Sequence, residues 1–179
     1  PAGCGVTGRT GTALYRAILA EPGEDTPRLV YADWLDEEGR AEEAEFLRVG
    51  CRVMALNSDD PGYAELILRH EELALWLATH VPGPTPKFAA GLELAGGPAW
   101  WQQSRRGFPQ HFEFDGEERP GLKPMRALAT ALEKAFRDVP TRMLAVRFVT
   151  VEQLAEFLQQ PVVEHLDGLV VQLRYEDEP

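Results

Sequence analysis

The sequence has few of the residues that carry covalent or metal chemistry. It contains two cysteines, Cys4 and Cys51, and four histidines among 179 residues. Two cysteines in such different surroundings do not suggest a disulfide, and two thiols alone do not form a zinc site. No apolar run approaches the roughly eighteen residues of a membrane-spanning helix, and the first eleven residues lack the basic and apolar regions of a signal peptide. We expect a cytoplasmic protein that does not enter a membrane.

Catalytic motifs are also missing. The two serines, Ser58 and Ser104, do not lie in a nucleophile-elbow sequence. The segment GVTGRTG lacks the Lys-Ser/Thr ending of a phosphate loop. His70 and His80 are ten residues apart, which on one helix separates them by about 15 Å along the axis, too far to share an ion. We expect no autonomous enzyme and no metal or cofactor.

Positive charge is scarce in the first half of the chain. The net charge is −11, and residues 1–80 hold 15 acidic side chains against 7 basic ones. Nucleic-acid binding relies on clustered lysine and arginine that release counterions from phosphates, so this composition argues against DNA or RNA. Another protein or a peptide is the expected partner, and the sequence leaves the oligomeric state open.

Turn and capping residues divide residues 12–81 into helices. After a Gly- and Thr-rich segment at 1–11, which we expect to be a disordered tail, apolar spacing predicts a helix up to Pro22. Thr26 is the predicted N-cap of a second helix, with Pro27 in its first turn and Gly39 as its left-handed stop. Further helices are predicted over 41–56 and 63–80. This part is expected to form an antiparallel helical cluster.

The pattern changes after residue 81. Three prolines in residues 81–86 mark a boundary, and 82–110 reads as a connecting segment. Over 111–179, strands alternate with helices. The strands are predicted at 111–115, 144–149 and 169–175, and the helices at 125–138 and 151–160, the last with Thr150 as its N-cap. The predicted fold class is therefore α+β, with a short α/β region after the helical cluster.

Three segments carry a resemblance to a known family. DTPRLVYADWLDEEG, residues 25–39, and AEFLRVGCRVMAL, residues 44–56, resemble the hallmark of the bacterial repeat-companion domain family. WWQQSRRGFPQHFEF, residues 100–114, is similar to the family's second element, which contains Arg-Gly-Phe. The resemblance runs from about Leu14 to the end of the chain and implies a helical module ahead of an array similar to leucine-rich repeats. It implies no common reaction.

The repeat-like region is short. Strand, helix and strand recur about 25 residues apart, from Leu144 to Leu169, which lies within the range of leucine-rich units. Such arrays normally need three or more units, whereas this region holds one and a half to two and lacks a clear asparagine ladder. Either the region packs back onto the helical half, or another protein completes its open edge.

Two groups of residues are candidates for partner binding. The first comprises Arg28, Tyr31, Asp33 and Trp34, with Asp36 nearby, and would hold a peptide through a guanidinium and an aromatic shelf. The second comprises Trp100, Trp101, Arg105, Arg106 and Phe108, and would bind an acidic partner. The alternatives are structural. In them, Trp34 is a core anchor, Arg28 pairs with Asp25 or another nearby acid, and the second group seals the joint between the halves.

The function that these features favour is a non-catalytic protein-interaction or scaffolding module. A second possibility is an accessory subunit that presents a peptide or protein substrate to a catalytic partner enzyme by adding it to the open sheet edge. A third is a small hydrolase that uses Asp33 and Asp36 as paired carboxylates, because a spacing of three places both on one side of a helix.

Overall fold

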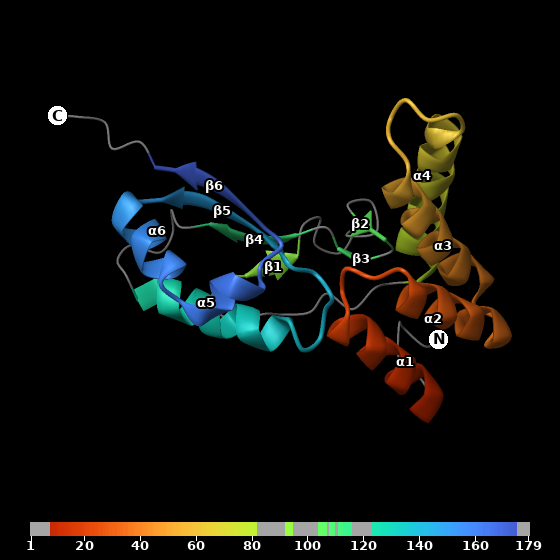
Figure 1. Ribbon diagram of the computed structural model, residues 1–179, viewed down its shortest axis with the longest axis horizontal. Helices are drawn as coiled ribbons and strands as arrows, with labels where there is room; N and C mark the ends of the chain where they lie inside the picture. Colours follow the sequence, from red (N-terminus) through yellow and green to blue (C-terminus); the bar gives the residue numbers. More distant parts are fainter. Residues whose placement is uncertain are drawn as a thin grey trace. The chain divides into compact units, whose positions relative to one another are not determined.

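The protein is an α+β chain that forms two compact units, shown as a computed structural model in Figure 1. The structure describes residues 8–81, 92–94, 104–106, 108–109, 111–115 and 123–174. The first unit combines Pro1–Thr85 with Gly96–Pro109, and the second combines Pro86–Ala95 with Gln110–Pro179. The chain therefore passes from one unit to the other three times, at about residues 85, 95 and 109.

The first unit is built from four helices, each packed against the next in the chain. They are α1 (Arg9–Ala20), α2 (Thr26–Glu37), α3 (Ala41–Ala55) and α4 (Tyr63–His80). The predicted helix over 63–80 has these bounds. The expected tail at 1–11 is too long, because residues 9–11 belong to α1. Gly11 is buried in α1 against Trp34. The apolar spacing of the sequence did not predict that this first turn is helical, because a glycine adds no apolar side chain to the pattern.

The turns around α2 only partly follow the prediction. Gly39 has a φ of 76° and supplies the left-handed residue after the helix, as expected. The N-cap is Asp25, not Thr26, and its side chain makes no capping hydrogen bond. The Asp25 carboxylate instead pairs with Arg106, a residue far along the chain, which local capping rules cannot anticipate.

A small hairpin also belongs to the first unit. Its strands, β2 (Ser104–Arg105) and β3 (Phe108–Pro109), pair antiparallel, and β2 contacts α3. Residues 92–94 lie instead in the second unit. The segment at 82–110, expected to be a simple connection, therefore contributes a strand or hairpin to each unit.

The interior of the first unit consists of two apolar clusters. One forms between α1, α2 and α3 around Ile18, Tyr31, Trp34, Leu35 and Leu47, with Phe108 packed against it. The other lies between α3 and α4 and contains Phe46, Val49, Leu73, Ala74 and Leu77. The apolar stripes of the amphipathic helices are thus paired, and the acidic faces turn to solvent.

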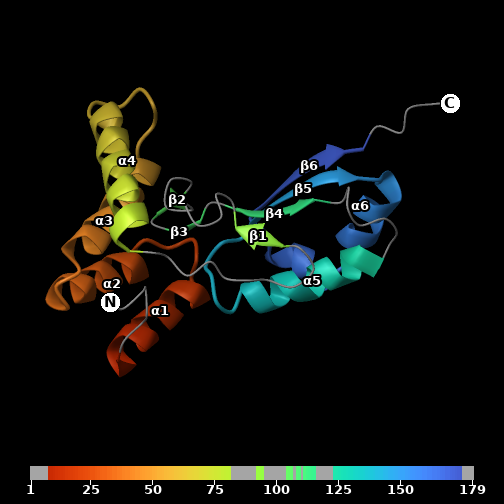
Figure 2. The same ribbon diagram turned by 180° about the vertical axis from the view of Figure 1, so that it is seen from behind.

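The second unit is a four-stranded sheet with its helices on one face, as Figures 1 and 2 show from opposite sides. The strand order is β1-β4-β5-β6. The elements are β1 (Glu93–Leu94), β4 (Phe112–Asp115), α5 (Lys123–Ala135), β5 (Met143–Val149), α6 (Val151–Leu158), the 3-10 helix η3 (Pro161–His165) and β6 (Gly168–Leu173). β1 pairs antiparallel with β4, whereas β4, β5 and β6 are parallel.

The parallel register follows the spacing of the sequence. Leu144 of β5 is the direct partner of Leu169 of β6, and Phe112 of β4 is the partner of Leu144. Phe112, Phe114, Leu144 and Val146 are buried in one core with α5, α6 and η3. Thr150 caps α6 as predicted: its hydroxyl accepts from the Gln153 amide, and the Gln153 side chain accepts from the Thr150 amide. Within the described residues, the sheet thus has a core face, an opposite face and a free edge at β6.

Candidate functional site

Arg28 is buried inside the first unit. Only 3% of the residue is exposed, and its guanidinium donates to the carbonyl oxygens of Pro22 and Glu24 at 2.7 and 2.5 Å. The side chain also lies over the ring of Phe108, with 5.5 Å from Cζ to the ring centroid. Burial lowers the pKa of Arg28 from its ordinary value. Arg28 therefore stabilises the turn before α2 from inside the unit, and its side chain is not exposed for a partner to bind.

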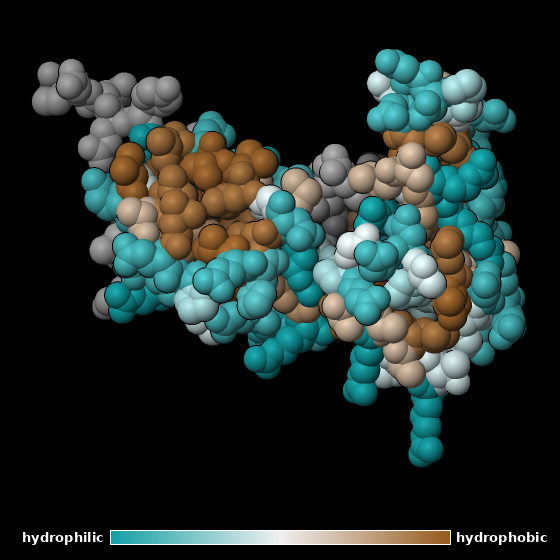
Figure 3. All heavy atoms as spheres, in the orientation of Figure 1, coloured by the Kyte–Doolittle hydropathy of each residue, from teal (hydrophilic) through white to brown (hydrophobic). Residues whose placement is uncertain are grey.

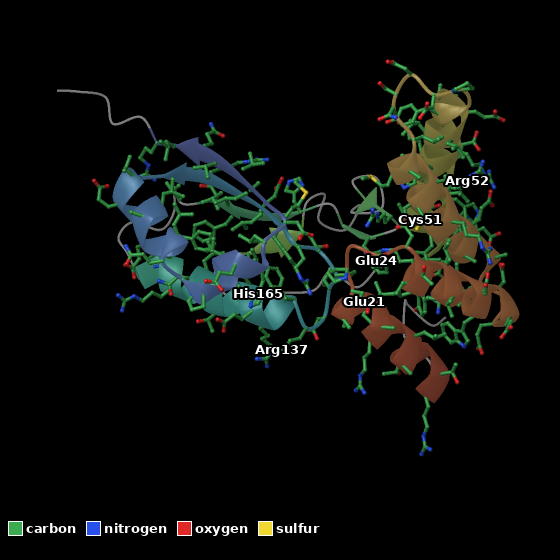
Figure 4. The ribbon with its side chains drawn as sticks, in the orientation of Figure 1. Glu21, Glu24, Cys51, Arg52, Arg137 and His165 are labelled. Atoms are coloured by element: carbon green, nitrogen blue, oxygen red, sulfur yellow. The ribbon has the colours of Figure 1, made fainter. Side chains whose placement is uncertain are left out.

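Arg106, on the hairpin, contacts the same turn. Its Nε lies 3.1 Å from Oδ1 of Asp25, and Nη1 donates to the carbonyl of Gly23. Figure 4 labels Glu21 and Glu24, which flank this turn between α1 and α2. Arg106 has a φ of 49°, in the left-handed region that is uncommon for residues other than glycine. The ion pair joins this turn of the hairpin to the turn between α1 and α2, within the first unit.

Phe108 joins the hairpin to the helical core. Its ring is 6.0 Å from that of Tyr15, measured between centroids, and it packs against the cluster of α1, α2 and α3. The two motifs that we treated as separate candidate sites therefore meet in one unit. The sequence held one signal for this meeting, the acidic start of the first motif and the arginines of the second, but their separation of about eighty residues left the pairing undetermined.

Tyr31 and Trp34 form the aromatic interior of this cluster. They are 5% and 7% exposed, and their rings stack with centroids 5.3 Å apart. A Cβ on Gly11 would lie 2.5 Å from the Trp34 ring, so α1 and α2 are as close as a glycine permits. The structural interpretation of Trp34 as a core anchor fits this placement. The interpretation of Arg28, Tyr31 and Trp34 as a surface for a partner is not retained, because all three are interior.

Asp33 and Asp36 lie on the solvent side of α2 and share one guanidinium. Arg48 of α3 places Nη2 at 2.7 Å from Asp33 and Nη1 at 2.6 Å from Asp36. These hydrogen bonds raise the pKa of Arg48. A paired-carboxylate hydrolase needs one carboxyl that holds a proton and one that is ionised. Here both carboxylates pair with the same guanidinium across two helices, so the arrangement is that of an interhelical ion pair, and nothing in it favours the hydrolase hypothesis.

The remaining residues of the second candidate group cannot be placed. Trp100 and Trp101 lie outside the described residues, and only the backbone of Arg105 is described. Their proposed role in binding an acidic partner stays a prediction. Of that group, Arg106 and Phe108 are half-buried in contacts within the first unit.

Cys51 is enclosed beside the same turn. It lies on α3 (Figure 4) and is 4% exposed. Burial, reinforced by the Asp25 carboxylate, raises the pKa of the thiol to about 12. A thiol in this state is a poor nucleophile and a poor metal ligand. Across the described part of the chain, no group of three or more His, Cys, Asp or Glu side chains has the arrangement of a metal site.

The end of the second unit presents an apolar surface. Val170 and Leu173 of β6 are 59% and 40% exposed, and Val151 and Leu158 of α6 are 63% and 50% exposed. Figure 3 shows apolar side chains gathered over the part of this unit that carries β5, β6 and α6. We call these four residues the β6 end. Val170 lines the outer face of the sheet with Ala145 and Arg147, whereas α6 covers the opposite face, so these exposed side chains lie on both sides of the edge strand β6. Gathered apolar groups, unlike scattered ones, are typical of interaction sites.

The outer face of the sheet is more polar. A shallow hollow of about 240 Å³ is lined by His111, Met143, Ala145, Arg147, Val170 and Gln172 with neighbouring strand residues. Within it, the carboxylate of Glu113 lies 3.2 Å from Nε2 of His111 and 3.0 Å from Nη2 of Arg147. Glu113 is thereby shared between two basic groups, and the hollow adjoins the β6 end through Val170.

Comparison with known proteins assigns no relative. No family model matches the chain, and neither the curated proteins nor the solved structures contain a significant match. Within the described residues, none of the helices combines the length and the apolar character that crossing a membrane requires. The functional argument therefore rests on the surfaces described above.

Proposed function

We propose that this protein is a non-catalytic protein-interaction module that works in the cytoplasm, and that the β6 end of its second unit is the docking element. The observation that carries the proposal is an edge strand without charge or proline, next to exposed apolar side chains of α6. The proposal includes the resemblance to the repeat-companion family, with the first unit as the helical module.

The chemistry of a sheet edge supports this proposal. An edge strand presents a row of backbone N–H and C=O groups that can pair with another chain. Proteins commonly block such edges with lysine, proline or a bulge in the edge strand, and Gly168–Leu173 contains neither a lysine nor a proline. An edge left in this state favours strand addition as the mode of recognition.

The likeness to leucine-rich units supports the same location. Parallel strands related by 25 residues, from Leu144 to Leu169, share one register and have their helical segments on one face. Units of this kind bury their apolar faces by stacking on a neighbour. The β6 end exposes valine and leucine, an apolar surface of the kind that such stacking covers.

The first unit supports a scaffolding role more than a recognition role. The described arginine and aromatic side chains of its two family-like motifs, among them Arg28, Arg106 and Phe108, make contacts within the unit. Its surface exposes apolar side chains of α4 such as Leu68 and Leu75, but residues 1–80 carry a net negative charge, which would steer the module toward basic partners.

A second candidate function uses the same edge. An accessory subunit would hold an extended peptide against β6 and present it to a catalytic partner enzyme. The edge strand favours this possibility over other enzymatic roles, because strand addition needs only backbone groups and pockets for alternate side chains. Binding of an isolated unstructured peptide, with no folded partner, would distinguish it from scaffolding.

Site-specific photo-crosslinking tests the proposal. A photoreactive amino acid at Val170 or Leu173, compared with the same group at Leu68, tests whether polypeptide contacts concentrate at the β6 end. Leu68 is a matched control because it is 62% exposed and lies on α4 of the first unit. We expect protein adducts from the β6 positions and none above background from Leu68. Equal labelling from all three positions, or adducts from Leu68 alone, would contradict the proposal.

A further inference from the structure

The hairpin of the first unit is held to the helices by a small set of described contacts. Its two strands have two residues each, and the structure describes the side chains of Arg106 and Phe108 in it. Arg106 pairs with Asp25 in the turn before α2. Phe108 packs against Tyr15 and lies over the guanidinium of Arg28. We call the strands β2 and β3, with these two side chains, the clasp, because together they close over this turn.

The closed clasp keeps charged groups in unfavourable surroundings. Arg28 is 3% exposed, its hydrogen bonds go to backbone carbonyl oxygens, and its Nε has no partner among the described residues. Burying a cation costs hydration that neutral acceptors replace only in part. Nε of Arg106 and Oδ1 of Asp25 face each other without an aligned hydrogen bond, and Arg106 has a φ of 49°. Opening of the clasp returns these groups to water and relieves the left-handed backbone of Arg106.

Cys51 lies beneath the clasp. It is 4% exposed, yet it belongs to neither of the apolar clusters that the described residues form in this unit. The charged groups around its thiol are those of Asp25, Arg28 and Arg106. β2 contacts α3, the helix that carries Cys51 (Figure 4). The thiol is therefore covered by the turn and the clasp, so its exposure does not require either apolar cluster to open.

We propose that the clasp opens separately from the helices, and that this opening exposes Arg28 and Cys51 to solvent while both apolar clusters stay folded. Elements held by few buried apolar contacts open at a lower free energy than the core of the same domain. The clasp belongs to the segment Gly96–Pro109, which the chain joins to the second unit at both ends. Opening therefore frees a segment from which two connections to the second unit lead. This conformational device does not depend on the β6 end.

Thiol labelling of the full chain at low urea concentrations tests the proposal. In a Cys4→Ser background Cys51 is the only thiol, and when closing is faster than labelling, the labelling rate reports the free energy of the opening that exposes it. We expect the rate to rise only weakly with urea, because opening of the clasp exposes little surface. Without urea, the rate should exceed that expected from unfolding of the whole unit by about tenfold or more.

A second buried thiol provides the matched control. Ala74 is 1% exposed and lies in the cluster between α3 and α4. The thiol of an Ala74→Cys chain that also carries Cys4→Ser and Cys51→Ala should be labelled only when that cluster unfolds, so its rate should rise steeply with urea. If Ala74→Cys alters the circular dichroism of the chain, the slope of equilibrium urea unfolding replaces it as the reference for Cys51.

Two further variants separate the clasp from the core. Arg106→Gln should raise the labelling rate of Cys51 without urea about threefold to tenfold, because an ion pair and a hydrogen bond that close the clasp are lost. Leu66→Ala removes a side chain that packs against the cluster of α3 and α4. It should lower the urea midpoint and leave the labelling rate of Cys51 without urea unchanged.

Two results would overturn the proposal. The first is that Cys51 and the thiol of the Ala74→Cys chain are labelled with the same rate and the same urea dependence, which would mean that the clasp opens only with the helices. The second is that Leu66→Ala accelerates the labelling of Cys51 as much as it accelerates that of the Ala74→Cys thiol. Neither result bears on the β6 end, so the two proposals can fail independently.

Discussion

Nε of Arg106 lies 3.1 Å from Oδ1 of Asp25, and this ion pair joins the hairpin of the first unit to the turn before α2. Each side chain keeps roughly a third of its surface in contact with solvent. Arg106 also donates to the Gly23 carbonyl, so it contacts both the charge and the backbone of the turn. The family-like motifs at 25–39 and 100–114 therefore act as one structural unit.

A double-mutant cycle measures this coupling. Asp25→Asn and Arg106→Gln should each lower the free energy of unfolding, and the double variant should lose less than the sum of the two. We expect a coupling energy of about 1 kcal/mol, because the pair is partly solvated. Urea unfolding of the four proteins gives this value, and strictly additive losses would show that the pair does not join the hairpin to the helices.

Gly11 should be intolerant of a side chain. A Cβ at this position would lie 2.5 Å from the Trp34 ring, so Gly11→Ala forces α1 away from α2. We expect a loss of about 1–3 kcal/mol in the free energy of unfolding, as for other overpacked interiors. The matched control is Gly23→Ala, because nothing lies within 4 Å of a Cβ there, and its effect should stay within about 0.5 kcal/mol.

The smaller ring of phenylalanine should relieve this clash. The closest atoms to a Cβ on Gly11 belong to the six-membered ring of Trp34, and Trp34→Phe removes part of that volume. In the Trp34→Phe background, Gly11→Ala should therefore cost less than in the wild type. An equal cost in both backgrounds would mean that another contact makes Gly11 necessary.

His70 makes stability depend on pH. Its ring stacks on Phe46, with centroids 4.6 Å apart, and burial lowers its pKa below the ordinary 6.5. Below about pH 6.5 the unfolded chain therefore binds a proton that the folded chain resists, and the free energy of unfolding falls as the pH is lowered.

His70→Phe keeps the aromatic stack and removes the titrating group, so its stability should vary less between pH 7 and pH 5. Glu45, whose pKa is lowered by its hydrogen bond to Arg69, contributes below its ordinary pKa of 4.5 and so outside this window. Urea unfolding at several pH values measures the difference. Identical pH profiles for the wild type and His70→Phe would contradict the assignment.

Cys51 should be unreactive in the folded protein. Its pKa of about 12 leaves almost no thiolate at pH 8, and its burial denies access to reagents. In a Cys4→Ser background, a thiol reagent should label the unfolded chain fully in a time that leaves the folded chain unlabelled. Rapid labelling under native conditions would show that the surroundings of Asp25 and Cys51 are open.

Local patterns predicted the elements well where turn chemistry bounded them. The turn residues between 57 and 62 bounded the predicted helix at 63–80. The 25-residue spacing predicted strands at 144–149 and 169–175, and the structure pairs them in parallel with Leu144 opposite Leu169. Both features depend on interactions within a short stretch of chain or on a simple repeat. The N-cap at Thr150 is of the same kind.

Contacts between distant segments were beyond the reach of the sequence. Helical spacing placed Asp33 and Asp36 on one side of a helix, but it did not show that Arg48 would lie between them. In the same way, nothing local paired Asp25 with Arg106 or required a glycine against Trp34. Such contacts depend on how helices pack, so residues that looked like a binding site became an interior.

Backbone hydrogen exchange over β6 tests the central claim most directly. We predict that the amides of Gly168–Leu173 exchange more slowly when a partner protein is bound than in the free chain, and that Val170→Lys restores fast exchange. The amides of α4 around Leu68 should show no such change. Association that leaves β6 unprotected while another surface becomes protected would contradict the account.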